Sequence, residues 1–138
     1  MRDERTIKLL HLLSMYKLVI NENGIGEIQI GDFRESFLAD FSFWSKSDYE
    51  VHWREASAQL AAGRAVSFIT SITDPSTSNF IRSWACYPIE CELVFQEQIL
   101  FLEELQQPFN INEPHFNALP YESVTEEGEK ISEWRLRA

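Results

Sequence analysis

Apolar residues recur at helical spacing in one segment of the chain. The positions that form this face are Tyr49, Trp53, Ala56 and Leu60. Their intervals of four, three and four residues place them on the same side of an amphipathic helix. Ser47 and Glu50 have the spacing of a capping box at its start, and Gly63 is typical of the residue beyond a helix end. The pattern predicts a helix over residues 48–62.

Segments rich in β-branched and aromatic residues lie on both sides of this helix and predict strands. The predicted strands are residues 17–21, 27–30, 65–73, 79–87, 92–102 and 130–136. Asn23 and Gly24 favour a hairpin turn between the first two strands. Pro88 has no N–H group to donate to a strand ladder, so it marks a bend between two of the later strands.

Two segments are less regular. Alternating apolar residues predict a strand that leads into the helix, at Phe37, Ala39, Phe41 and Phe43. Residues 108–120 are ambiguous, and Pro114 has the residue type favoured at the first position of a short helix. Strands dominate, and most are separated by short turns. We therefore expect a single α+β domain over residues 1–138, mainly antiparallel β-sheet, with one firm amphipathic helix packed on it.

The acidic residues are unevenly distributed. The chain has a net charge of −10, yet residues 1–64 carry eight Lys or Arg against ten Asp or Glu. No Lys or Arg lies between Ser83 and Glu129, a stretch with ten glutamates. Binding to nucleic acid or to an anionic membrane surface needs the opposite charge and is disfavoured. An acidic surface favours a basic partner, although it can also serve solubility alone.

The N-terminal segment and the cysteines bear on the compartment. Residues 7–20 are fairly apolar, but they are too short for a membrane span, and no small-residue cleavage site follows. Cys86 and Cys91 form neither a disulfide framework nor a pair with metal-ligand spacing. We expect two buried thiols in a reduced compartment, and a cytoplasmic location.

Motifs of catalysis are lacking in the sequence. It has no phosphate loop, dinucleotide fingerprint, HExxH helix or nucleophile elbow. His52 and Glu55 are the only possible pair of metal ligands at helical spacing, and such a pair is typical of solvated surface. The strand around Cys86 favours a structural thiol over a catalytic one. We expect no catalytic residue, no cofactor, no metal ligand and no small-molecule substrate.

Four segments stand out by their order along the chain. They are residues 44–49 (WSKSDY) with Trp53, residues 79–84 (NFIRSW), residues 99–104 (ILFLEE) and residues 130–134 (KISEW). In this order they resemble the immunity proteins of bacterial contact-dependent growth inhibition systems, the CdiI family, in its Enterobacter-type group. The resemblance implies a sheet architecture similar to the Whirly fold. It also implies 1:1 binding of a cognate toxin C-terminal domain (CdiA-CT-like), commonly a nuclease with a basic surface.

The resemblance and the charge pattern together give a hypothesis for the toxin-binding surface. Its residues are Glu103, Glu104, Glu122, Glu126, Glu127 and Glu129, which would mimic a phosphate backbone and occlude a basic active site. Trp53, Trp84 and Trp134 are interpreted as core anchors. Two other classes stay open: an acidic, nucleic-acid-mimicking regulator of another basic protein, and a small enzyme of unknown class with a carboxylate-containing cleft.

Overall fold

Two antiparallel sheets make up most of the structure, a computed structural model that describes residues 4–137. The three-stranded sheet has the order β1 (Tyr16–Ile20), β2 (Ile25–Ile30), β3 (Phe33–Leu38). The four-stranded sheet has the order β4 (Val66–Ser71), β5 (Phe80–Ile89), β6 (Glu92–Phe101), β7 (Trp134–Arg137). The helices are α1 (Glu4–Leu13), α2 (Lys46–Ala61) and the short 3-10 turns η1 (Leu102–Glu104) and η2 (Pro114–Phe116). The prediction of an α+β, mainly antiparallel fold is confirmed.

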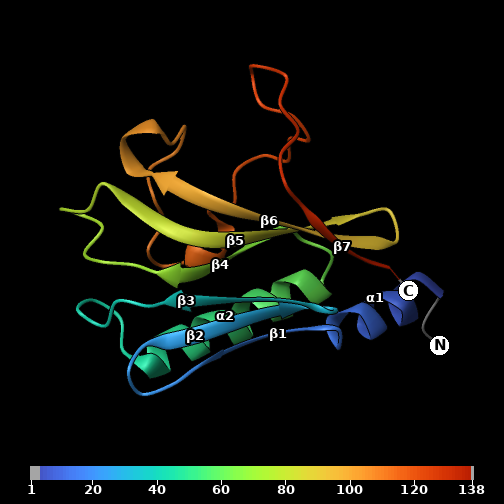
Figure 1. Cartoon of the computed structure of the whole chain (residues 1–138), viewed down its shortest axis with the longest axis horizontal. Helices are drawn as coiled ribbons and strands as arrows, with labels where there is room; N and C mark the ends of the chain where they lie inside the picture. Colours follow the sequence, from blue (N-terminus) through green and yellow to red (C-terminus); the bar gives the residue numbers. More distant parts are fainter. Residues whose placement is uncertain (1–3, 138) are drawn as a thin grey trace.

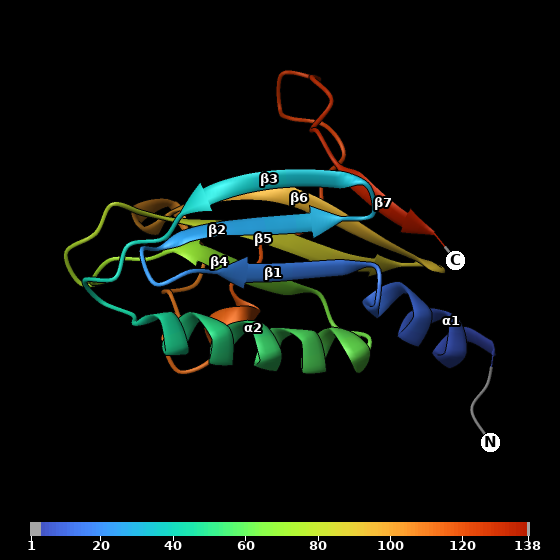
Figure 2. The same ribbon diagram turned by 60° about the horizontal axis from the view of Figure 1, so that its bottom comes forward.

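The two sheets stack face to face, and α2 runs beside them along β1 and β4 (Figures 1 and 2). Aromatic side chains fill the space between the sheets. The Tyr16 ring lies 5.5 Å from Phe68 and 5.4 Å from Phe95, measured between centroids. Trp53 and Trp84 are buried and Trp134 packs against the same core, so their interpretation as core residues is confirmed. The likeness to the Whirly fold stays a prediction.

Helix α2 begins earlier than predicted. Ser45, rather than Ser47, is the N-cap, and it exchanges hydrogen bonds with Asp48 in a capping box. Aromatic residues on either side of the cap explain why the helix begins at Ser45 and not at Ser47. Trp44, just before the cap, packs edge-on against Tyr49 at 5.3 Å, an arrangement known as a hydrophobic staple. A cap at Ser47 would leave this contact outside the helix start.

Side chains of α2 bind the free edge of β4. The ring nitrogen Nε2 of His52 accepts a hydrogen bond from the Ile69 N–H at 2.8 Å. The Trp53 indole N–H donates to the Ile69 carbonyl at 2.8 Å, and the Tyr49 hydroxyl accepts from the Ile72 N–H at 3.0 Å. Unpaired backbone groups at a buried sheet edge are costly, and these bonds satisfy them. The interpretation of His52 as solvated surface is wrong, because the residue is buried.

The structure contains a second α-helix, α1, which the pattern does not predict. Its Leu12 is buried, while Leu9 and Leu13 pack against the core, a spacing of three and four residues that defines one helix face. Charged and histidine side chains interrupt the segment and conceal this face in the sequence. Within residues 4–137 no helix is both long enough and apolar enough to cross a membrane.

The bend predicted at Pro88 is wrong, since Pro88 lies within β5 and pairs with Leu93. Pairing between β4 and β5 ends at Cys86, so Pro88 occupies a stretch with a neighbour on one side only, where proline is tolerated. The turn comes at Glu90, whose φ is 56°. Cys86 is buried as expected, but Cys91 beside this turn is exposed, which corrects the expectation of two buried thiols.

Two further element boundaries differ from the prediction, and one agrees with it. β3 ends at Leu38, so Phe41 and Phe43 lie on a turn and are partly exposed instead of continuing a strand into α2. β7 begins only at Trp134, and residues 130–133 contribute no strand. η2 begins at Pro114, as predicted for a short helix.

Candidate protein-binding surfaces

Three of the predicted glutamates lie on a projecting loop, residues 124–130, called here the acidic loop. An isolated bridge between Val124 and Lys130 closes it, and the Thr125 N–H donates to the Glu129 carbonyl at 2.8 Å. Its tip holds Glu126 and Glu127. All three glutamates are exposed, and the loop stands away from the sheets in Figure 1. The backbone bonds hold the loop in a defined shape while leaving its carboxylates free to meet a partner.

The other predicted glutamates lie elsewhere. Glu103 and Glu104 are exposed on η1, at the end of β6, which Figures 1 and 2 both show apart from the acidic loop. Glu122 is exposed too, and the Gln96 side-chain amide anchors its backbone by donating to the Glu122 carbonyl at 2.9 Å. The structure therefore exposes all six predicted side chains but does not gather them into one cluster.

The two arginines near the C-terminus are paired with other carboxylates. Arg135 contacts Glu133 at 2.7 Å and Glu92 at 2.9 Å, and Arg137 contacts Glu92 at 2.8 Å. The hydrogen bond from Arg135 is the main reason why the pKa of Glu92 is lowered. Among the side chains that the structure describes, none of the six predicted glutamates takes part in an ion pair. Their charge is available to a partner.

A second surface lies on the side of β5 and β6 that faces the three-stranded sheet. Strand alternation puts one set of residues on this side, at the end of the strands beyond Trp84: Phe80, Arg82, Glu97, Ile99 and Phe101. The Phe80 and Phe101 rings lie 6.4 Å apart and are 42% and 48% exposed. The Arg82 guanidinium lies 5.6 Å from the Phe80 ring. We call these five residues, with Glu35 of β3, the open face.

Two carboxylates meet on the open face from different sheets. Glu35 lies on β3 between Phe33, which packs on Trp84, and Phe37. Partial burial and then the nearby carboxylate of Glu97 raise the pKa of Glu35 above its ordinary value. Neither residue forms an ion pair with a cation whose side chain the structure describes. The pair therefore concentrates carboxylates beside exposed aromatic rings.

The groups that could support catalysis are placed unfavourably. Burial raises the pKa of the Cys86 thiol well above its usual range, which suppresses the reactive thiolate. His52 and His115 stack at 6.5 Å with both Nδ1 atoms buried and without a hydrogen-bond partner among residues 4–137. In this part of the chain no three His, Cys, Asp or Glu side chains converge on a possible metal position.

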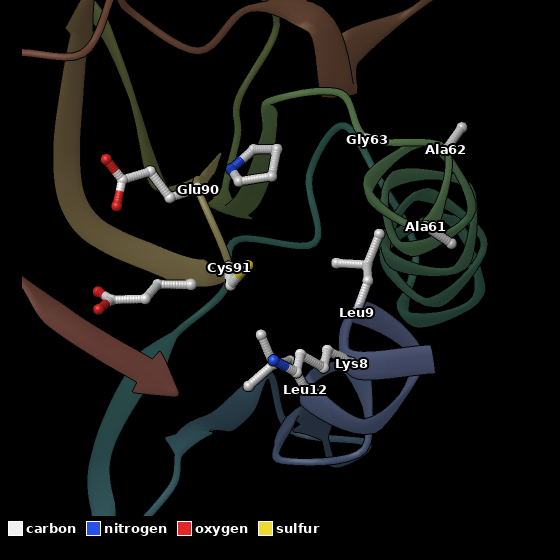
Figure 3. Close-up of a pocket in the computed structure, with 10 residues that line it drawn as sticks. Lys8, Leu9, Leu12, Ala61, Ala62, Gly63, Glu90 and Cys91 are labelled. Carbon is white, nitrogen blue, oxygen red and sulfur yellow. The ribbon is translucent and has the colours of Figure 1, made fainter. Parts of the chain in front are cut away.

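A hollow of about 330 Å³ lies between α1, the end of α2 and the β5–β6 turn. Leu9 and Leu12 form one wall, Ala61 and Gly63 another, and Cys91 lies across from them (Figure 3). The Glu90 carboxylate points away from the α1 and α2 walls. Lys8 and Glu92 also line the hollow, but Glu92 is already paired with Arg135 and Arg137.

Comparisons with known proteins identify the family. Residues 39–138 match the CdiI N-terminal domain family. The chain belongs to this family. The immunity protein CdiI of Enterobacter cloacae is 29% identical over 110 residues, which are 78% of this chain and 74% of that protein. The resemblance seen in the four sequence segments is confirmed.

Structural comparison agrees with this CdiI assignment. A chain of the solved CdiA-CT/CdiI toxin and immunity complex from Enterobacter cloacae superposes with a TM-score of 0.73 at 25% identity. The match covers 88% of this chain and 90% of that one. The chain therefore resembles CdiI proteins in both sequence and fold.

Sequence reasoning missed the open face. Strand alternation in residues 79–87 and 92–102 places Phe80, Arg82 and Phe101 on one side of a hairpin, so the sequence could have predicted this part of the face. Nothing in the sequence indicates that Glu35 meets Glu97. Their proximity depends on how one sheet lies over the other.

Proposed function

We propose that this chain is an immunity protein that binds the toxin domain of its own contact-dependent growth inhibition system and neutralises it in the cytoplasm. Membership of the CdiI family carries the proposal, together with a relative solved in a toxin and immunity complex. The chain acts by binding and not by catalysis. The charge of −10 and the exposed, unpaired glutamates favour a basic partner surface.

An acidic inhibitor favours a toxin with a basic surface, and a nuclease has such a surface because it binds phosphate backbones. We therefore propose that the toxin is a nuclease. Glu126, Glu127 and Glu129 of the acidic loop, with Glu122, would occlude such a surface. Glu103 and Glu104 would extend the contact to the end of β6. Steering between opposite charges also speeds encounter, which suits an inhibitor that must act before the toxin does.

Growth of bacteria that express the adjacent toxin domain, with and without this chain, tests the proposal. Rescue of growth, together with tight 1:1 binding by calorimetry, is the expected result. Changing Glu126, Glu127 and Glu129 together to lysine should weaken binding by ~2 kcal/mol or more if they meet desolvated cations. If neither rescue nor binding occurs with the wild-type chain, the immunity function is wrong.

A further inference from the structure

The open face has the composition of a protein contact. Two partly exposed phenylalanines and an isoleucine, Ile99, which is 40% exposed, lie side by side on paired strands. Adjacent exposed apolar side chains with a polar rim are typical of interaction surfaces. Arg82, stacked on Phe80, belongs to a residue type enriched among the side chains that contribute most to binding.

The backbone beneath this face belongs to a hydrogen-bonded sheet. β5 pairs with β4 on one side, where Ser71 faces Arg82, and with β6 on the other. A surface already in its bound shape loses little conformational entropy on association. The acidic loop is also held by backbone hydrogen bonds, but it projects from the sheets, whereas the open face lies on paired strands and carries exposed aromatic side chains suited to affinity.

The charges on this face indicate the occupant. The carboxylates of Glu35 and Glu97 lie together, and an added cation would relieve the repulsion between them. A second copy of this chain would bring the same carboxylates and another charge of −10, so self-association is disfavoured. A nucleic acid is disfavoured for the same reason. A basic protein surface could supply a cation for the two carboxylates and apolar side chains for the aromatic rings of the open face.

We propose that the open face is a contact surface for the cognate toxin, with a toxin lysine or arginine seated between Glu35 and Glu97 and apolar toxin side chains on Phe80 and Phe101. This inference rests on the proposed function and adds to it a site that the glutamate stretch of the sequence does not indicate. The acidic loop steers the toxin, and the open face retains it.

Calorimetry with the purified cognate toxin domain tests the inference. The variant Glu35→Gln/Glu97→Gln should raise the Kd ~30-fold or more, since a desolvated cation loses its partners. Phe101→Ala should raise it about tenfold. The control Glu55→Gln/Glu113→Gln removes the same two charges from exposed positions without ion pairs, and it should change the Kd less than about threefold.

The outcomes separate the two proposals. If the wild-type chain binds but the Glu35→Gln/Glu97→Gln variant matches its control, the open face is not the contact surface and the immunity function stands. If the wild-type chain fails to bind, the proposed function itself is wrong. Thermal unfolding of each variant alone shows that it folds. A concentration-dependent dimer of the chain that Phe101→Ala abolishes would overturn the toxin as occupant in favour of a second copy.

Discussion

His52 accepts a hydrogen bond at Nε2 from the backbone N–H of Ile69, so its imidazole is neutral and carries its proton on Nδ1. Burial, and then the neighbouring His115, lower the pKa of His52 to about 3. Protonation would place two donors against each other at the edge of β4. The contact between α2 and the four-stranded sheet thus depends on an uncharged histidine.

The fold should lose stability as the pH falls from 6.5 toward 3. Because the pKa in the folded state is depressed, the contribution is complete above the unfolded value of 6.5 and decreases below it. At pH 5 the loss is about 2 kcal/mol, from ~1.4 kcal/mol for each pH unit below 6.5. Urea unfolding at pH 7.5 and pH 5 measures it. His52→Gln should flatten this dependence, whereas His11→Gln, at an exposed position, should not.

The cap of α2 gives a sharp choice between neighbouring serines. Ser45→Ala should destabilise the fold by about 1 kcal/mol, because the Asp48 N–H loses its acceptor. Ser47→Ala should change the free energy of unfolding by less than ~0.5 kcal/mol, since Ser47 lies within the first helical turn and is exposed. Denaturant titration of both variants decides the matter, and a larger effect at Ser47 would contradict the capping box at Ser45.

Local patterns predict local structure well in this chain. The face of Tyr49, Trp53 and Leu60 lies where helical spacing places it. Burial alternates along β2 and β3, whereas β4 is buried on both sides. The division into two sheets could not be predicted, because alternation shows which side of a strand is apolar but not which strand lies above it. For the same reason His52 looks like surface in the sequence. Its buried partner, Ile69, lies 17 residues away on an edge strand.

Gly26 of β2 is required by close packing. An added Cβ would lie against the Phe37 ring and 2.9 Å from the Val19 carbonyl oxygen. Gly26→Ala should therefore cost about 2 kcal/mol through overpacking. Phe37→Leu in the same chain should recover part of this cost because it shortens the obstructing side chain, a coupling that a double-mutant cycle on urea unfolding would measure. Additive effects would contradict the contact.

Stopped-flow association with the toxin should separate the two surfaces. Charge reversal at Glu126, Glu127 and Glu129 should lower the association rate and its dependence on salt, because the acidic loop is fully accessible to solvent ions. Phe101→Ala should instead speed dissociation and leave the salt dependence unchanged. The reverse assignment of rates would contradict the division between steering and retention.

The carboxylate pair of the open face should cost the free protein stability. The pKa of Glu35 is raised above its ordinary value of 4.5, so its favourable contribution belongs to the protonated form and is lost as the pH rises through the folded-state pKa. Glu35→Gln should therefore raise the melting temperature at pH 7.5 and give no gain near pH 4. Glu55→Gln, at an exposed helix position, serves as the control. A variant that is more stable alone yet binds the toxin more weakly would indicate that the pair is kept for binding, whereas equal melting temperatures at pH 7.5 would contradict repulsion between Glu35 and Glu97.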